Sequence, residues 1–178
     1  MLQHFAPQSL RPMLALGLVA CASAEPPTAA GLGPGAVQAP VSQAYEIRLQ
    51  RGACFGRCPQ YSLLIRDGEA EFSGERFVAV LETVKGPADA AALERLLALL
   101  RAPAVSRLKD IYRPGQPGCG AVATDMPSSR IDWTLDGQSH QLTLYHGCQG
   151  APVELRALPA AIDAAGNSQR WINEGLDR

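Results

Sequence analysis

The five cysteines are the residues of this sequence with the most specific chemistry, and their positions separate them into two groups. Cys21 ends an apolar segment near the start of the chain, whereas Cys54, Cys58, Cys119 and Cys148 are spread over the rest. Four cysteines can form two disulfides, bind a metal ion or exchange disulfides with a partner, and three pairings are open to them.

The first two of these four cysteines stand close together, in the segment Cys54-Phe55-Gly56-Arg57-Cys58-Pro59. An extended chain would separate their Cα atoms by about 13 Å, whereas a disulfide needs less than about 7 Å. A disulfide therefore requires a tight turn, which Gly56 and Pro59 would permit.

The other two cysteines stand in glycine-containing loops, Gly118-Cys119-Gly120 and Gly147-Cys148-Gln149-Gly150. We therefore predict one disulfide between Cys54 and Cys58 and a second between Cys119 and Cys148. The second bridge would join the loop before one predicted hairpin to the loop after it.

Redox exchange and metal binding through Cys54 and Cys58 are the alternatives to structural disulfides. Working dithiols usually have two intervening residues at a helix N-terminus, whereas here three residues intervene and a strand is expected to follow. The pair has a spacing that zinc ligands allow, but Cys119 and Cys148 form no second zinc knuckle. We expect structural disulfides and no cofactor.

Other residue types offer weaker candidates for chemistry. His140 and His146 share the parity of one strand, but six strand residues separate them by about 20 Å, which is too far for one metal ion. Asp125 could act as an acid or base, although an aspartate in a turn usually accepts hydrogen bonds from nearby backbone amides. Because no phosphate loop, HExxH sequence or nucleophile elbow is present, we predict no catalytic residue, and a hydrolase is the second alternative.

The start of the chain has the features of an export signal. Arg11 supplies positive charge and Met13 to Ala20 is a short apolar core. The sequence Leu18-Val19-Ala20-Cys21 resembles the lipobox of bacterial lipoproteins, in which cleavage before the cysteine exposes a thiol that receives lipid. We predict a signal peptide over 1–20 and lipidation at Cys21, with Ala22 next to it favouring sorting to the outer membrane.

Simple secretory cleavage is the alternative, because Ala22-Ser23-Ala24 before Glu25 fits the small-x-small pattern. That cleavage would release a soluble periplasmic protein without Cys21.

The next segment has the composition of a flexible tether, since thirteen of the twenty-two residues from Ala22 to Gln43 are Ala, Pro or Gly. We therefore expect a lipidated tether over 21–43 and a single globular domain over 44–178. With 16 basic and 17 acidic residues and no long run of like charge, the chain has no polyanion-binding face. Nucleic acid is not an expected partner.

Alternating apolar residues predict strands, first over Tyr45 to Leu49 and then over Tyr61 to Ile65. Asp67-Gly68 and Asp136-Gly137 each separate two such segments, which predicts two hairpins. A further strand is predicted from Phe77 to Val84.

Helices are predicted where apolar residues follow the helical period. The stripe of Leu93, Leu96, Leu97 and Leu100 predicts one helix, with Pro87 in its first turn and Pro103 at its end.

A shorter stripe over Leu155, Leu158 and Ile162 predicts a second helix, which Pro159 should break or kink. A last helix is predicted to carry Trp171, with Asn167 or Ser168 as its cap. This order predicts an α+β fold: an antiparallel sheet built from hairpins, with helices packed on one face and disulfides as staples.

The octapeptide Cys54-Phe55-Gly56-Arg57-Cys58-Pro59-Gln60-Tyr61, followed by a strand and Asp67-Gly68, resembles a bacterial family known as domain of unknown function 6438. The resemblance extends from about Ala44 to Trp171. Its most specific part is the CFGxCPxY octapeptide, which includes Phe55, Gly56, Pro59 and Tyr61 beside the two cysteines. Agreement is looser around Tyr112, Asp125-Met126-Pro127, Ile162-Asp163 and Trp171-Ile172.

The family implies a small exported or lipoprotein-borne α+β domain, with no activity attached, and Cys119 and Cys148 lie beyond its shared pattern. We therefore expect a non-enzymatic binding or interaction domain of the cell envelope, held to the membrane by lipid alone, whose partner is a periplasmic protein or ligand.

Overall fold

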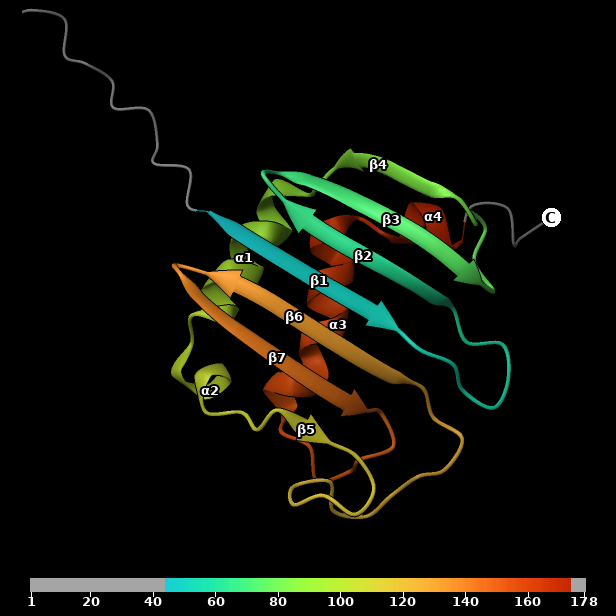
Figure 1. The fold of residues 1–178 in the computed structure, drawn as a ribbon, viewed down its shortest axis with the longest axis vertical. Helices are drawn as coiled ribbons and strands as arrows, with labels where there is room; N and C mark the ends of the chain where they lie inside the picture. The colour runs from blue at the N-terminus through green and yellow to red at the C-terminus, as the bar shows by residue number, and fades with distance from the viewer. Residues whose placement is uncertain (1–43, 174–178) are drawn as a thin grey trace, which may run out of the picture. The chain divides into compact units, whose positions relative to one another are not determined.

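The computed structural model describes residues 44–173, which form a seven-stranded sheet with helices on one face (Figure 1). The strands are β1 (Tyr45–Arg51), β2 (Gln60–Arg66), β3 (Glu69–Arg76), β4 (Thr83–Pro87), β5 (Ile111–Tyr112), β6 (Ser128–Leu135) and β7 (Gln138–Tyr145). The helices are α1 (Ala90–Leu100), α2 (Pro103–Ser106), α3 (Val153–Gly166) and α4 (Gln169–Ile172). The expected signal peptide, Cys21 and the expected tether lie outside the described residues.

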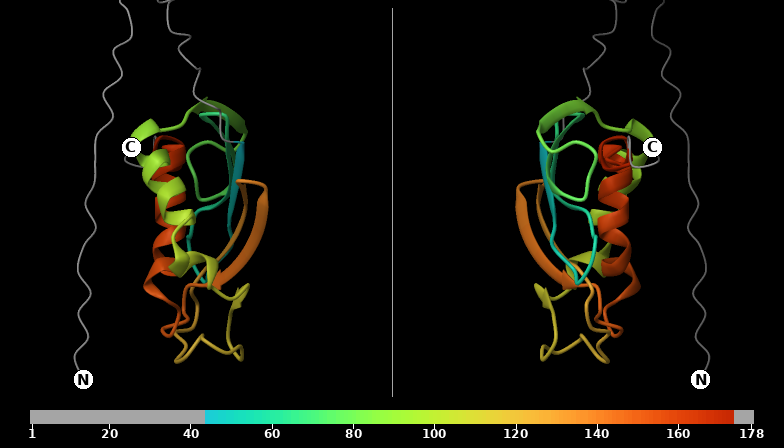
Figure 2. Two further views of the ribbon diagram at one scale, coloured as in Figure 1. Left: turned by 90° about the vertical axis from the view of Figure 1, so that its left-hand side faces the viewer. Right: turned by 90° about the vertical axis from the view of Figure 1, so that its right-hand side faces the viewer.

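The strand order is β4-β3-β2-β1-β6-β7-β5, and every neighbouring pair is antiparallel except β5 and β7, which are parallel. Side views show the helices in one layer and the sheet in another (Figure 2). The predicted α+β class, with helices on one face and disulfides, is confirmed. No helix of residues 44–173 combines the length and the apolar character that a bilayer crossing requires.

Both predicted hairpins are present, because their turn sequences allow the required backbone. Asp67 and Gly68 have φ values of 51° and 74°, and Asp136 and Gly137 have values of 53° and 78°. Positive φ at both central residues is the type I′ geometry that matches the twist of the flanking strands.

The strand predicted from Phe77 to Val84 is wrong in position, since β4 starts only at Thr83. Phe77 has a φ of 55°, and the backbone N–H groups of Ala79 and Val80 donate to the carbonyls of Ile172 and Trp171. This segment therefore pairs with the backbone of α4 instead of with a strand, a long-range contact that alternation does not encode.

Helix α1 buries Leu93, Leu96 and Leu100 of the predicted stripe and leaves Leu97 partly buried, and its two proline boundaries differ from the prediction. Asp89 is the N-cap and its side chain accepts the Ala92 N–H at 2.8 Å, whereas Pro87 ends β4. Pro103 starts α2 instead of only ending α1, because a proline fits the first turn of a helix.

Pro159 is predicted to break or kink its helix, and the break is wrong, because α3 continues through Pro159 to Gly166. A proline in a helix interior costs about 3 kcal/mol. Here Leu155, Leu158 and Ile162 are fully buried against the sheet, and that burial offsets the cost.

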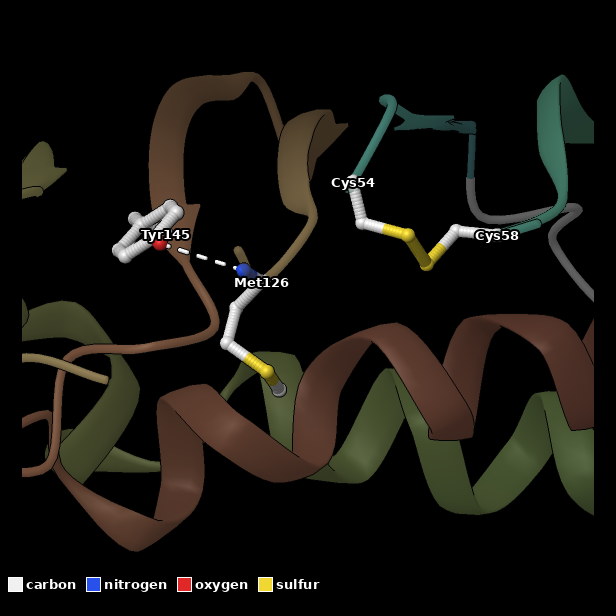
Figure 3. Close-up of a disulfide and its surroundings, with 4 residues drawn as sticks. All are labelled: Cys54, Cys58, Met126 and Tyr145. Carbon is white, nitrogen blue, oxygen red and sulfur yellow. Dashed lines mark hydrogen bonds between the residues drawn. A yellow bond between two sulfur atoms is a disulfide. The ribbon is translucent and has the colours of Figure 1, made fainter. Parts of the chain in front are cut away.

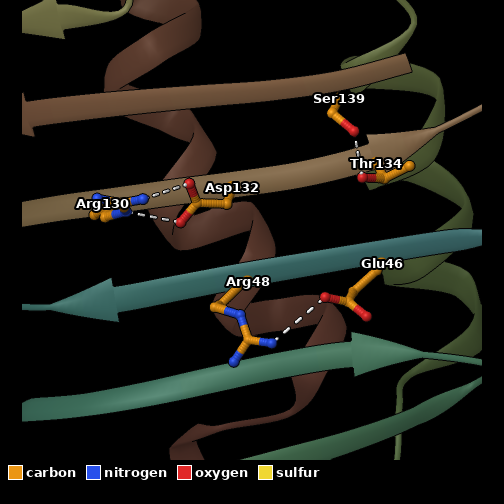
Figure 4. Close-up of polar contacts among 6 residues, drawn as sticks. All are labelled: Glu46, Arg48, Arg130, Asp132, Thr134 and Ser139. Carbon is orange, nitrogen blue, oxygen red and sulfur yellow. Dashed lines mark hydrogen bonds and ion pairs between the residues drawn. The ribbon is translucent and has the colours of Figure 1, made fainter. Parts of the chain in front are cut away.

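The sheet face opposite the helices is polar, and many of its charged side chains interact with one another (Figure 4). Arg48 Nη2 lies 3.4 Å from Glu46, and Arg130 Nε donates to Asp132 at 2.9 Å. The hydroxyls of Thr134 and Ser139 lie 2.8 Å apart across β6 and β7. The core therefore lies between the sheet and the helices, and the other face is open to solvent.

Candidate functional site

The loop between β1 and β2 carries the octapeptide and is fixed at two points. A disulfide joins Cys54 to Cys58, whose Cα atoms are 5.8 Å apart, and the Phe55 N–H donates to the Asp125 carbonyl at 3.2 Å. Gly56 has a φ of 148° at the turn. The loop is therefore held against the segment that precedes β6.

The segment before β6 is held in turn by β7. The Met126 N–H donates to Tyr145 Oη at 3.2 Å, beside the Cys54–Cys58 disulfide (Figure 3). Phe55 is 88% exposed and Met126 is 42% exposed, so apolar side chains are presented to solvent at this end of the sheet.

A buried polar network lies behind the loop and joins the sheet to α3. Asp163 Oδ2 accepts a hydrogen bond from Arg51 Nη2 at 2.5 Å. Asp163 Oδ1 accepts from Tyr61 Oη at 2.6 Å and from Ser168 Oγ at 2.9 Å. Each carboxylate oxygen of Asp163 thus receives at least one donor, which is how a carboxylate that is 5% exposed is stabilised.

Strand register explains how these side chains meet. Arg51 and Tyr61 are directly opposite each other on β1 and β2, and alternation turns both toward the helices. Asp163 lies on the buried stripe of α3, next to Ile162. Three side chains therefore meet behind the loop: Arg51 from the end of β1, Tyr61 from the start of β2 and Asp163 from α3.

The electrostatics of the network follow from its burial. The pKa of Tyr61 is raised by burial and by the neighbouring Asp163 carboxylate, so the phenol stays protonated and donates. Arg51 remains charged, with Asp163 as its counter-ion, and its Nε is buried without a hydrogen-bond partner among the described residues.

A cavity of about 320 Å³ opens beside this network, and we call it the Arg51 pocket. Within the described part of the chain, the charged side chains that line it are Arg51 and Asp163. The octapeptide contributes three of its residues to the wall. The lining residues are Arg51, Gly52, Cys58, Pro59, Tyr61, Pro127, Asp163, Gln169, Ile172 and Asn173.

The second disulfide is more deeply placed than the first. It joins Cys119 to Cys148, which are each 1% exposed, whereas Cys54 and Cys58 are partly exposed. The two disulfides are the pairs proposed from the loop sequences. Residues 44–173 contain no group of three or more His, Cys, Asp or Glu side chains placed to hold a metal ion.

The two histidines considered as ligands have separate surroundings. His140 stacks on Trp133, with ring centroids 4.8 Å apart. His146 Nε2 lies 2.7 Å from Ser129 Oγ, and its pKa is lowered by burial and by the charge of Arg51. Although this places a base beside a hydroxyl, Ser129 is 1% exposed and neither residue lines the Arg51 pocket.

The family-motif residues named from the sequence divide by role. Pro59 and Tyr61 line the Arg51 pocket, Gly56 forms the turn, and Phe55 points to solvent. Asp125 has a φ of 64°, and its side chain accepts from the Thr124 hydroxyl at 3.1 Å.

Sequence reasoning missed Arg51 and Asp163 as members of the site. A signal was available, because Arg51 continues the inward parity of Tyr45, Ile47 and Leu49, and Asp163 extends an apolar helical stripe. A charged residue at an inward position needs a partner when the chain folds.

Among models of protein families, the one described as "Domain of unknown function (DUF6438)" matches residues 45–166. The match includes Arg51, the octapeptide and Asp163. No curated protein matches the chain.

Proposed function

We propose a function from the geometry of the site, because this chain belongs to the family described as a domain of unknown function (DUF6438), a description that names no activity. The protein is a non-enzymatic binding domain of the cell envelope, and the Arg51 pocket is where it binds its ligand.

The observation that carries this proposal is the position of a buried charged network at the wall of an open cavity. Arg51 is fixed by Asp163 and its side chain is still 20% exposed, so the cavity presents a fixed guanidinium. A pocket with mostly uncharged walls and a few convergent polar groups is the usual form of a small-ligand site.

The open sheet face supports binding less well than the pocket. Its charged residues interact with each other, as Arg130 does with Asp132 and Lys85 with Glu71 at 3.0 Å. A hollow of about 330 Å³ on this face is lined by such pairs, and its charged residues Arg48 and Asp132 already have charged partners at the surface.

A fragment screen followed by protein NMR tests the proposal. Compounds of mixed charge and polarity would be added to the labelled domain, and the shifted backbone amides would be mapped. We expect hits to cluster on Gly52, Tyr61 and Gln169. Hits that map elsewhere, for example around Gly137 at the opposite end of the sheet, would refute the pocket as the binding site.

We also propose that the protein is exported and anchored at Cys21, with the domain facing the periplasm. Two disulfides support export, since such bonds persist in oxidising compartments. The test is a Cys21→Ser precursor, for which we expect loss of lipid and release from the membrane. Unchanged processing and membrane attachment would rule out lipidation at this residue.

Thiol–disulfide exchange is the second candidate function, and the placement of Cys58 in the pocket wall favours it. In that reaction a partner dithiol would give two electrons and two protons to the Cys54–Cys58 disulfide and become a disulfide itself. Titration of free thiols in protein isolated from the native envelope tests it. A fully oxidised pair that resists reduction by a dithiol would exclude the role.

A further inference from the structure

The guanidinium of Arg51 is only partly satisfied by the protein. It donates through Nη2 to Asp163 and its Nε is buried without a partner among residues 44–173, but the side chain as a whole is 20% exposed, so other N–H donors of the group face the cavity. A guanidinium has several N–H donors in one plane, and that geometry matches a carboxylate. A ligand with acceptor oxygens would therefore bond the N–H donors of this group that reach the cavity.

Asp163 does not prevent a second carboxylate from approaching. Oδ1 of Asp163 accepts from Tyr61 and Ser168, and Oδ2 accepts from Arg51. The incoming anion would meet the N–H donors of Arg51. The carboxylate oxygens of Asp163 are already hydrogen-bonded to Arg51, Tyr61 and Ser168. Because Arg51 and Asp163 cancel in charge, the pocket favours a singly charged anion over a multiply charged one.

The rest of the cavity suits an apolar body. Pro59, Pro127 and Ile172 contribute apolar surface, and Gln169 and Asn173 contribute neutral amides. A volume of about 320 Å³ is at the small end of the range for ligand sites, so the bound part of the ligand is compact.

We infer that the Arg51 pocket binds a monocarboxylate with a compact apolar body, and that Arg51 is the residue that binds the carboxylate. This inference rests on the proposed binding function and specifies its ligand class. The same chemistry is present in a small branched organic acid and in the C-terminal end of a peptide.

A matched pair of probes tests the carboxylate directly on the unmodified protein. 4-Methylpentanoate and 4-methylpentanamide have the same apolar body and differ in charge. We expect the acid to bind at least about tenfold more tightly than the amide, since bonds to a charged partner exceed neutral ones by that much. The backbone amides of Gly52, Tyr61 and Gln169 should shift, and those of Gly68 and Gly137 should not.

Single substitutions then test whether Arg51 is the residue that gives the preference for the acid. Arg51→Gln should reduce the preference for the acid to less than about threefold, and Arg51→Lys should weaken acid binding because the planar fork is lost. Arg101→Gln removes a guanidinium at the opposite end of the sheet and should leave the preference unchanged. If Arg51→Gln fails to fold, the acid and amide pair on the unmodified protein still decides the question.

Further probes separate the two sources of the ligand. Acetyl-Ala-Ala-Leu with a free C-terminus is compared with its C-terminal amide and with 4-methylpentanoate. Tighter binding of the peptide acid identifies a chain end, and tighter binding of the small acid identifies a free metabolite-sized acid.

Three outcomes would overturn the inference. Equal binding of acid and amide at the pocket excludes the carboxylate but leaves the proposed binding function intact. Inorganic phosphate that binds as tightly as the acid shows a general anion site. If neither 4-methylpentanoate nor the peptide acid binds while the fragment screen still finds hits in the pocket, the ligand class is wrong. If the screen finds no hits in the pocket, the proposed function itself is refuted.

Discussion

Arg51 and Asp163 are 112 residues apart in the chain, yet Nη2 of one donates to Oδ2 of the other at 2.5 Å. This bond joins the end of β1 to α3, and Tyr61 and Ser168 complete the shell around the carboxylate. The pair connects the core with the candidate ligand site, so its chemistry affects both stability and binding.

Replacing Asp163 should destabilise the fold. Asp163→Asn keeps the size of the side chain but removes the charge that compensates Arg51, and breaking a buried pair in this way costs about 3 kcal/mol. Urea unfolding measures the loss. The matched control is Asp136→Asn, whose pair with Arg101 is at the surface and whose loss should leave the free energy of unfolding nearly unchanged. Equal losses for the two variants would contradict the structural role of Asp163.

Stability should fall when the pH drops below neutrality, in part because of His146. Burial and Arg51 lower its pKa in the folded state below the usual value of 6.5, so the unfolded chain binds the proton more readily. The contribution is complete above about pH 6.5 and is lost as the pH falls toward the lower folded-state pKa. Denaturant titrations across this range should show a weaker pH dependence for His146→Gln than for the unmodified protein, and an unchanged dependence would contradict the assignment to His146.

The two disulfides should differ in their effect on stability. In the chain-entropy relation, closing a loop of about five residues contributes about 2 kcal/mol, and closing one of about thirty contributes about 3.6 kcal/mol. Cys54 and Cys58 are separated by 4 positions, and Cys119 and Cys148 by 29. Thermal unfolding of the two paired Cys→Ala variants should therefore show the larger loss for Cys119 and Cys148. The reverse order would mean that the octapeptide loop has a larger structural role than its length implies.

Phe55 should be dispensable for folding although it belongs to the family motif. It is 88% exposed, and replacing an exposed side chain usually changes stability by less than about 0.5 kcal/mol. Phe55→Ser should therefore unfold at nearly the same urea concentration as the unmodified protein. Phe72→Ala, at a position that is fully buried, should lose about 3–5 kcal/mol. A large loss for Phe55→Ser would assign this phenylalanine to the structure of the loop.

Gly74 should tolerate no side chain, because the segment after β3 folds back over it. A Cβ at this position would lie 1.9 Å from the Val80 carbonyl oxygen, so Gly74→Ala forces the backbone apart and should cost about 1–3 kcal/mol. At Gly52 the nearest atom would be 3.4 Å away, so Gly52→Ala should have little effect. Calorimetric unfolding of the two variants checks the difference.

Local sequence alone determined much of the architecture. Alternation identified β1 and β2, because one buried face gives a period of two, and Asp-Gly pairs identified the hairpins through their tolerance of positive φ. The leucine stripe identified α1 in the same way. These signals are local, and the structure retains them.

Only the tertiary structure decided the remaining features, because they depend on contacts between distant segments. Residues after Phe77 bond to the backbone of Trp171 and Ile172, which removes the expected strand, and burial of α3 keeps the helix intact through Pro159. The Arg51 pocket also depends on contacts between segments that are distant in the sequence. Arg51 and Asp163 each violate a local apolar pattern, and only strand register and helix packing show that the two exceptions compensate each other.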